Sequence, residues 1–183
     1  MEFFKDYFNL IGKKIDDAEY QKFYETVKLI EQVRDNSKKI IFAGNGGSAA
    51  MSSHLTVDMT KVGRVRSINF NEADLLTCFS NDYGYERVYE KAIEFYGDSG
   101  DLAILISSSG KSQNMVNAAN KAKEMDINVV TFTGFDLNNP LKKLGDVNFW
   151  IDSKAYNIVE MTHHIWLLSI VDYLAGDIYY PAN

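Results

Sequence analysis

The chain has 183 residues, of which 46% are hydrophobic and 24% are charged. That length and balance are enough to bury a full hydrophobic core, so we expect a single domain. The formal net charge of -6 and the pI near 5.1 argue against nonspecific nucleic-acid binding through bulk charge and leave room only for a small local basic patch. The expected partner is therefore a small molecule or another protein.

The single cysteine and the apolar segments bear on where the protein resides. With only Cys78, an internal disulfide and a cysteine-based structural zinc site are excluded, and a reducing compartment is favoured. Cys78 itself is expected to be a small core residue. The first ten residues lack the basic start and continuous apolar stretch of a signal peptide, and no later run reaches the ~18 apolar residues of a membrane span. We expect a cytoplasmic protein with no membrane partner.

Two apolar stripes with helical spacing precede the first expected strand. The first comprises Phe3, Phe4, Tyr7, Phe8 and Ile11, and the second comprises Phe23, Val27, Ile30 and Val33. These stripes contain more large apolar side chains than a helix that packs on one face of a sheet needs, which favours a contact between subunits. We therefore divide the single domain, 1–183, into N-terminal oligomerisation helices, 1–36, and an α/β core, 37–183.

A glycine turn, GNGG at 44–47, follows the apolar run at 40–43. The run is expected to be a buried parallel strand, and the turn leads directly into a helix. Glycine lets an anion approach the backbone, and the amides of Ser48 and the next residues are expected to be free at the positive end of that helix. One helix terminus gives an exposed anion only about 0.3 to 1 kcal/mol, so further donors are needed. A lone turn of this kind is as often a plain connection.

Strands and helices alternate through the rest of the chain. Strands are expected at 67–70, 102–106, 129–133 and 147–151, and helices at 72–79, 88–96, 113–125 and 156–174, with a short helix opening at 139–141. A polar turn is expected at 81–84. This alternation predicts a three-layer α/β fold with a mostly parallel sheet.

A serine turn, SSSGKS at 107–112, follows the strand at 102–106 and contains Ser107, Ser108, Ser109 and Ser112. A helix N-cap uses one such hydroxyl, so four exceed what capping requires. The carboxyl ends of parallel strands meet at one edge of a sheet, where the serine turn and the glycine turn can converge on one ligand. Together these donors predict a phosphate-bearing ligand.

Three motifs thus occur in a fixed order: GNGGSAA at 44–50 followed by His54, then NDYG at 81–84, then SSSGKS at 107–112. Together they resemble the sugar isomerase (SIS) domain of the phosphoheptose isomerases across almost the whole chain. The resemblance implies a flavodoxin-like SIS domain that forms a homotetramer through its N-terminal helices, with active sites at subunit interfaces. It also implies conversion of sedoheptulose 7-phosphate to D-glycero-D-manno-heptose 7-phosphate for a capsule or lipopolysaccharide.

The resemblance also implies which residues bind the substrate. The family's phosphate-binding loop is matched by Ser107, Ser108, Ser109 and Ser112. Positions that line its sugar site are matched by Asn45, Gly46, Ser48 and Asp82.

At the metal site the resemblance is incomplete. Family isomerases bind zinc through a His and a Glu on the first core helix and a Gln and a His on the last. Here His54 is in place and Asp58 replaces the Glu, but the other two ligands fall on Val159 and Leu167, which cannot bind a metal. Since His163 lies four residues from each of these, within one helical turn of about 5.4 Å, we expect it to be a displaced third zinc ligand beside His54 and Asp58.

Interconversion of a ketose and an aldose needs a base that moves a proton between neighbouring carbons and a group that stabilises the enediolate oxygens. The expected base is Asp58, with His163 as acid or metal ligand and Glu160 as the alternative base. Each has a structural alternative. His163 and His164 can be polar residues packed at a subunit interface, and Glu160 can be a surface charge or a salt-bridge partner.

Two other functions remain open. The replaced ligands allow a catalytically inactive regulator that only binds a sugar phosphate. A structural tetramer that presents a surface to another protein, in the manner of the initiator-associating DiaA protein, is the third hypothesis. We prefer the isomerase because His54, Asp58, Glu160 and His163 retain acid–base groups that a purely structural remnant does not need.

Overall fold

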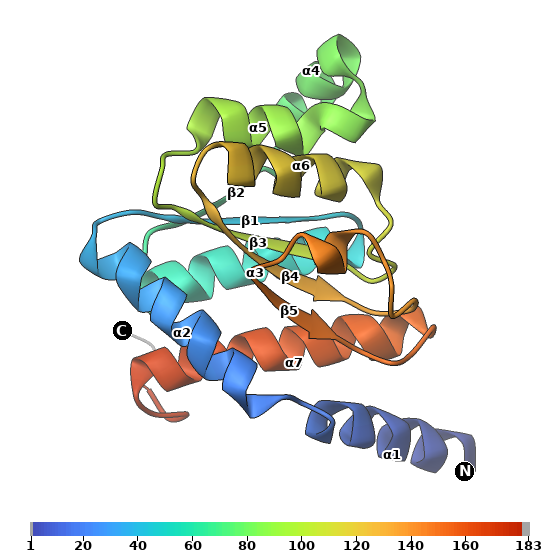
Figure 1. Ribbon diagram of the computed structural model, residues 1–183. Coiled ribbons are helices and arrows are strands. Elements are labelled where there is room, and N and C mark those ends of the chain that lie inside the picture. The colour runs from blue at the N-terminus through green and yellow to red at the C-terminus, as the bar shows by residue number, and fades with distance from the viewer. Residues whose placement is uncertain (1, 181–183) are drawn as a thin grey trace.

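A five-stranded sheet forms the centre of the molecule in the computed structural model, which describes residues 2–180 (Figure 1). Its strands are β1 (Ile40–Gly44), β2 (Ser67–Asn69), β3 (Leu102–Ser107), β4 (Asn128–Thr133) and β5 (Val147–Trp150). They are hydrogen-bonded in the order β2-β1-β3-β4-β5, and every neighbouring pair is parallel. The predicted flavodoxin-like α/β fold is confirmed. The strand order reverses between β1 and β3, where sheets of this type leave a crevice.

Helices cover both faces of the sheet, which confirms the three layers. The α-helices are α1 (Glu2–Asp16), α2 (Tyr20–Asp35), α3 (Gly47–Lys61), α4 (Ala73–Tyr83), α5 (Val88–Tyr96), α6 (Gln113–Glu124) and α7 (Tyr156–Ala175), and the 3-10 helices are η1 (Tyr85–Arg87) and η2 (Leu141–Lys143). In Figure 1, α2, α3 and α7 lie on one face, α5 and α6 lie on the other, and α4 lies beyond α5. Within residues 2–180, no helix is both long enough and apolar enough to cross a bilayer.

The pleat of the strands divides the core into two clusters. Ile40 and Phe42 pack against the side that carries α2, α3 and α7, whereas Ile41 and Ala43 pack beneath α5 and α6. All residues of β1 and β3 are buried, which explains why these strands are apolar at consecutive positions. The two strands therefore hold the turns at their carboxyl ends on a rigid base.

The first helix, α1, extends away from the body of the domain (Figure 1). None of its residues is buried, and Phe3, Phe4 and Phe8 are 70%, 64% and 64% exposed. Its end is attached by Trp166 of α7, whose Nε1 donates to the backbone oxygen of Ile15 at 3.1 Å. Exposed aromatic side chains in this number are typical of a surface that another chain covers. The second stripe is not free for such a contact, because Val27, Ile30 and Val33 are buried in the core of the same chain. An oligomerisation role for 1–36 stays a prediction.

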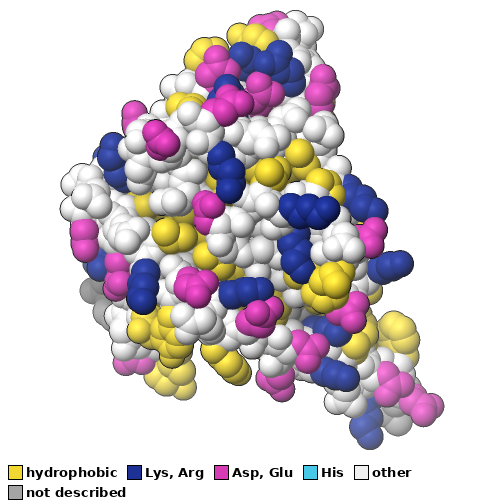
Figure 2. All heavy atoms as spheres, viewed as in Figure 1, with side chains coloured by type: hydrophobic (Ala, Val, Ile, Leu, Met, Phe, Trp, Pro, Cys, Tyr) yellow, Lys and Arg dark blue, Asp and Glu magenta, His cyan; other side chains and the backbone are white. Residues whose placement is uncertain are grey.

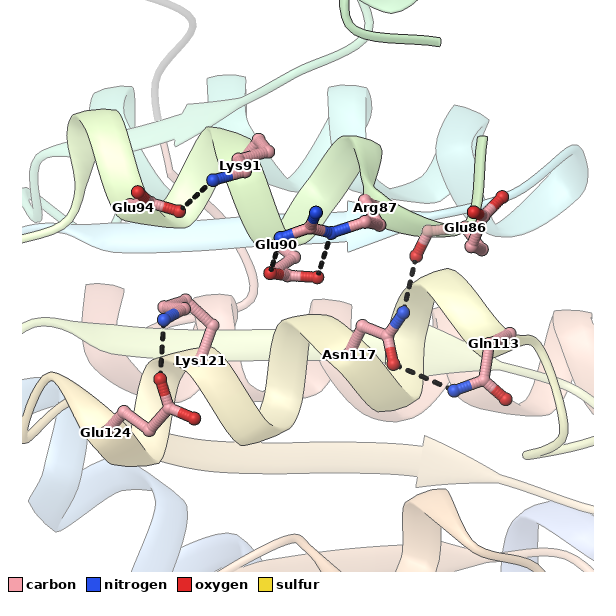
Figure 3. Close-up of polar contacts among 9 residues, drawn as sticks. All are labelled: Glu86, Arg87, Glu90, Lys91, Glu94, Gln113, Asn117, Lys121 and Glu124. Atoms are coloured by element: carbon pink, nitrogen blue, oxygen red, sulfur yellow. Dashed lines mark hydrogen bonds and ion pairs between the residues drawn. The ribbon is translucent and has the colours of Figure 1, made fainter. Parts of the chain in front are cut away.

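The outer surface of α5 and α6 carries a mixed layer of charges (Figure 3). Ion pairs join Arg87 to Glu90, Lys91 to Glu94 and Lys121 to Glu124. On the face shown in Figure 2, Lys and Arg side chains are interspersed with Asp and Glu. Exposed pairs of this kind each contribute little to stability. A more consequential contact is the hydrogen bond of 2.8 Å from Asn117 Nδ2 to the backbone oxygen of Glu86, because it ties η1 to α6.

Two local predictions about α4 were wrong, and the short helix expected to open at 139–141 is present as a 3-10 helix. Cys78 is exposed rather than buried, since α4 lies outside the two main layers and none of its residues is buried. The segment expected as a polar turn at 81–84 completes α4, and the chain turns only at Gly84, with a φ of +83°. The short helix expected at 139–141 is the 3-10 helix η2, which begins after Pro140.

Candidate functional site

A cavity of about 300 Å³ opens beside the carboxyl ends of β1 and β3. Its lining comprises Asn45, Gly46, Gly47, Ser48, Ile106, Ser107, Ser108, Ser109, Ser112, Tyr156 and Glu160. The glycine turn and the serine turn therefore meet at one edge of the sheet, next to the reversal of strand order, as the sequence predicted. No sequence motif indicates Tyr156, which α7 brings to the cavity.

The glycine turn offers fewer free amides than the sequence suggested. Gly46 has a φ of +56°, a left-handed conformation that favours glycine. The amides of Ser48 and Ala49 donate to the backbone oxygens of Asn45 and Gly46 at 3.0 Å each. The expectation that these two amides are free for an anion is therefore wrong. Across residues 45–49 of the described chain, the amides without a backbone partner are those of Asn45, Gly46 and Gly47.

The serine turn presents hydroxyls that no helix cap uses. α6 begins at Gln113, and its N-cap residue, Ser112, makes no side-chain capping hydrogen bond. Instead, Ser107 Oγ donates to Ser112 Oγ at 3.2 Å, and Ser109 Oγ accepts from the amide of Lys111 at 3.2 Å. The hydroxyls lie in the cavity beside the positive end of α6, an arrangement that suits an anion better than it suits a plain cap.

The buried side chain of Asn139 packs against the serine turn at Gly110. Gly110 has a φ of +62°, and a Cβ at this position would collide with the side chain of Asn139, which is buried. The backbone oxygen of Gly110 accepts from the amide of Leu141 at 3.1 Å, and Asn139 Nδ2 donates to the backbone oxygen of Asp136 at 2.8 Å. The turn is thus held in place before any ligand arrives.

A network that the sequence did not reveal holds Asn45 at the cavity. Asn45 Nδ2 donates to Asn114 Oδ1 at 2.9 Å, and Asn114 Nδ2 donates back to Asn45 Oδ1 at 3.0 Å. The hydroxyl of Tyr85 donates to the same Asn45 Oδ1 at 2.7 Å. Asn114 lies in the first turn of α6, two residues after Ser112. Its closeness to the serine turn is the one sequence signal that could have marked it as a site residue. Tyr85 has no such signal, because only the attachment of η1 to α6 brings it there.

Glu160 reaches the cavity from α7. Ser108 Oγ donates to Glu160 Oε1 at 3.5 Å, and a Cβ at Gly47 would collide with the Glu160 carboxylate. A carboxylate repels a phosphate, and the cavity's lining residues in the described chain include no lysine or arginine. A phosphate would therefore lie toward the hydroxyls of the serine turn and the start of α6, with the uncharged part of the ligand toward Glu160.

His163 lies in the core and not beside His54, so the prediction that it joins His54 and Asp58 is corrected. Its side chain is fully buried, its ring packs on Phe132 and Trp166, and its Nε2 donates to the backbone oxygen of Thr133 at 3.0 Å. Burial lowers the pKa of His163 to about 4, and the hydrogen bond to Thr133 opposes that effect only in part. A neutral core histidine of this kind can neither serve as an acid in the cavity nor bind the expected metal.

The buried neutral His163 is expected to make the fold less stable in mild acid. An unfolded histidine takes up its proton near pH 6.5, whereas folded His163 has a pKa of about 4. As the pH falls from about 6.5 toward 4, the unfolded state gains protons first, so the free energy of unfolding should drop by at most about 3 kcal/mol from this group. Urea titrations across that range should show a smaller drop for His163→Gln. Equal drops in both proteins would contradict the assignment.

The histidine that meets His54 is His164. His54 Nδ1 lies 2.9 Å from His164 Nε2, and on the other side of the ring His54 Nε2 lies 3.1 Å from Asp58 Oδ2. We call these three side chains the Asp58–His54–His164 array. Burial and the neighbouring His54 lower the pKa of His164, while Asp58 opposes the shift. The side chains of His54 and Asp58 are 48% and 23% exposed, so the array is open to solvent.

Comparisons with known proteins show which family this geometry belongs to. The profile of the SIS domain matches residues 3–134, which is more than half of the chain. The chain belongs to the SIS-domain family. Phosphoheptose isomerases are among its relatives, so this SIS domain falls within their branch and is an isomerase-class enzyme.

Three of these relatives show how far the likeness extends. The phosphoheptose isomerase of Fusobacterium nucleatum is 33% identical over 179 residues, which cover 92% of this chain and 90% of the relative. That of Sulfurimonas denitrificans is 32% identical over 177 residues, which cover 87% of this chain and 89% of the relative. The structure of the phosphoheptose isomerase from Neisseria gonorrhoeae is similar with a TM-score of 0.87 at 28% identity, covering 94% of this chain and 98% of that one.

The zinc site that the resemblance implies does not fit the residues of this SIS domain. Val159 and Leu167, where two family ligands fall, are buried in the apolar core. The two ring nitrogens of His54 point to opposite sides, so one ion cannot lie between His54 and both Asp58 and His164. Among residues 2–180, no three His, Cys, Asp or Glu side chains are arranged to hold a metal ion.

The predicted binding residues of the SIS domain fall into two groups. Asn45, Gly46, Ser48 and the four serines of the serine turn line the cavity. Asp82 does not line it in the single chain. It is exposed near the end of α4, where its Oδ1 accepts from Asn81 Nδ2 at 2.8 Å.

Proposed function

We propose that this SIS domain is a phosphosugar isomerase of the cytoplasm that interconverts sedoheptulose 7-phosphate and D-glycero-D-manno-heptose 7-phosphate for a capsule or lipopolysaccharide. The substrate class is supported by the phosphoheptose isomerases that match almost the full chain. The observation that carries the proposal is the meeting of two donor-rich turns around one cavity of about 300 Å³, with Glu160 at one end. The phosphate of a phosphorylated sugar suits the hydroxyl and amide donors of the cavity, and its uncharged end suits the part beside Glu160.

In this proposal the serine turn binds the phosphate. Its hydroxyls and the first amides of α6 are uncharged donors, each worth about 1.5 to 3 kcal/mol when it bonds to a charged group. Asn45, oriented by Asn114 and Tyr85, then faces the sugar hydroxyls. Donors that are already in place before binding add less entropic cost when the ligand arrives.

The chemistry requires one proton to move between neighbouring carbons. A base takes a proton from C1 of the ketose, the C–H electron pair forms a C1–C2 double bond, and the carbonyl oxygen is protonated to give an enediol. Return of a proton to C2, with loss of the O1 proton, gives the aldose. Glu160 in the cavity and Asp58 along α3 are the carboxylates available for these steps.

The proposal includes a homotetramer formed through α1 and α2. An apolar groove of about 310 Å³ between α2, α7 and their connection to α1 supports it, with Tyr20, Phe23, Tyr24, Ile165 and Tyr173 among its lining residues. Together with the exposed aromatic residues of α1, this groove gives a second copy of the chain a surface to cover.

An isomerase assay tests the proposed function directly. Purified protein is incubated with sedoheptulose 7-phosphate, and the aldose product is followed by NMR. We expect conversion to the same equilibrium mixture from either sugar phosphate, and none from unphosphorylated sedoheptulose, because the serine turn then has no anion to hold. Binding of sedoheptulose 7-phosphate without any conversion would overturn the isomerase.

Binding of sedoheptulose 7-phosphate without conversion would favour the inactive regulator. The buried Val159 and Leu167 at the family's ligand positions are one observation in favour of that hypothesis. If the protein bound no sugar phosphate and yet remained an oligomer, the structural, DiaA-like hypothesis would be favoured instead.

A further inference from the structure

We propose that Tyr85 is a positioning residue of the cavity, whose hydroxyl sets the side-chain amide of Asn45 so that this amide offers the ligand a hydrogen-bond donor and no acceptor. The inference rests on the proposed isomerase function and deepens it, because it defines the polarity of one contact with the sugar phosphate. Tyr85 belongs to neither of the two donor-rich turns. Its role follows from how three neighbouring side chains use their donors and acceptors.

The side-chain amides of Asn45 and Asn114 form a reciprocal pair. Asn45 Nδ2 donates to Asn114 Oδ1 at 2.9 Å, and Asn114 Nδ2 donates to Asn45 Oδ1 at 3.0 Å. Turning both amides over would exchange the donors for the acceptors and still give two hydrogen bonds of similar length. Asn45 lines the cavity, so the two arrangements offer the ligand different groups, an N–H in one and a carbonyl oxygen in the other. The pair alone does not decide between them.

The hydroxyl of Tyr85 decides between the two arrangements. It lies 2.7 Å from Asn45 Oδ1, which is usual for an O–H···O bond and short for an N–H···O bond, whose usual length is about 2.9 to 3.0 Å. The hydroxyl therefore donates to a carbonyl oxygen. With Tyr85 and Asn114 both donating, the two lone pairs of Asn45 Oδ1 are occupied. What remains is one N–H of Asn45 Nδ2, for which residues 2–180 provide no acceptor.

The segment that carries Tyr85 is attached to α6, the helix that follows the serine turn. Asn117 Nδ2 donates to the backbone oxygen of Glu86 at 2.8 Å, and Gln113 Nε2 donates to Asn117 Oδ1 at 2.8 Å (Figure 3). Tyr85 is 55% exposed, so its ring is not held by burial. The attachment of η1 to α6 and the bond to Asn45 hold it instead. One helix thus sets both the serine turn and the donor at Asn45.

The arrangement of the amide determines which ligand atom Asn45 can bind. An N–H binds an oxygen through a lone pair, whereas a carbonyl oxygen in its place would bind only a hydroxyl proton and would repel a phosphate or carbonyl oxygen. An oxygen that carries negative charge, or that gains it when the enediolate forms, is stabilised by the N–H arrangement alone. Tyr85 therefore favours an electron-rich oxygen of the sugar phosphate at this position.

A double-mutant cycle measured by isothermal titration calorimetry tests whether Tyr85 acts through Asn45. Tyr85→Phe should bind sedoheptulose 7-phosphate about 2- to 10-fold more weakly than the wild type, the range for one net hydrogen bond. In protein that already carries Asn45→Ala, the same change should alter the affinity by less than about 1.5-fold, since the group that Tyr85 positions is gone. Equal losses in the two backgrounds would overturn the inference, because a merely structural hydroxyl acts in both.

The polarity of the amide can be read directly by NMR. In protein labelled with ¹⁵N, the Asn45 side-chain signals are assigned from the spectrum of Asn45→Ala. On addition of sedoheptulose 7-phosphate, one of the two Hδ2 signals of Asn45 should move downfield as its N–H bonds to the ligand. If the ligand binds and neither signal moves, the amide presents its oxygen to the cavity and the inference is wrong.

Tyr96→Phe is the matched control, because it removes the same hydroxyl from another exposed tyrosine. The side chain of Tyr96 is 51% exposed, lies outside the cavity lining and packs on Phe70, and its hydroxyl makes no hydrogen bond within residues 2–180. Its loss should leave the affinity for sedoheptulose 7-phosphate unchanged. Thermal unfolding confirms that each variant folds.

The outcomes separate this inference from the proposed function. If the wild type isomerises sedoheptulose 7-phosphate and Tyr85→Phe binds it as tightly as the wild type does, Tyr85 does not position Asn45 and the isomerase stands. If the wild type binds the sugar phosphate without converting it, the isomerase fails, and the cycle still decides the role of Tyr85. If the folded wild type does not bind it, both proposals fail.

Discussion

Replacing Ser108 and Ser109 together with alanine is expected to weaken binding of sedoheptulose 7-phosphate by roughly 10²- to 10⁴-fold. Both hydroxyls line the cavity beside the start of α6. Each hydrogen bond to a charged group contributes about 1.5 to 3 kcal/mol, so the loss of two amounts to about 3 to 6 kcal/mol. Isothermal titration calorimetry of the wild type and the double variant measures the change.

The matched control for the serine pair is Ser67→Ala combined with Ser99→Ala. These two serines lie outside the cavity lining, so affinity should stay within about twofold of wild type, while both double variants should keep the wild-type circular dichroism. If the Ser108 and Ser109 variant binds as tightly as its control, the phosphate does not lie at the serine turn, and the orientation of the ligand in the cavity is wrong.

Replacing Asp101 with alanine is expected to lower the free energy of unfolding by about 3 to 5 kcal/mol, the usual cost of removing one partner from a buried charge pair. Asp101 is fully buried at the amino-terminal edge of the sheet, where its Oδ2 lies 2.6 Å from Lys39 Nζ. Its two oxygens also accept from the amides of Lys39, at 3.0 Å, and Asp98, at 2.9 Å. Burial tends to lower the pKa of Lys39, but the hydrogen bonds and charges of Asp101 and Asp98 outweigh it and raise that pKa.

The control for Asp101 is Asp98→Ala, which removes the exposed partner of the same lysine. The side chain of Asp98 is 69% exposed, and an exposed ion pair contributes little to stability. Urea unfolding of both variants gives the comparison. Similar losses of stability in the two would show that Asp101 holds the ends of β1 and β3 together no better than a surface charge does.

The fold and the cavity could largely be predicted because their signals are local. Apolar runs at 40–43 and 102–106 are long enough for a strand and end in residues that turn the chain, so they predict β1 and β3 to within one residue of their ends. Parallel strands bring such turns to one edge, and hence the meeting of the glycine turn and the serine turn followed from the pattern. The apolar pattern predicts the helix α4 but not that none of its residues is buried, and the prediction of a buried Cys78 is therefore wrong.

The sequence by itself determined the order of the strands and helices, the two donor-rich turns and the family to which they belong. Only the tertiary structure decided that His163 is a buried core residue and that His164 meets His54. The physical reason lies in α7, where buried residues such as Ile158, Thr162 and Trp166 alternate with exposed apolar ones such as Met161 and Ile165. A helix that is apolar on nearly every side can be rotated about its axis without changing its pattern. Its packing against α3 and the sheet therefore selects which of two neighbouring histidines meets His54.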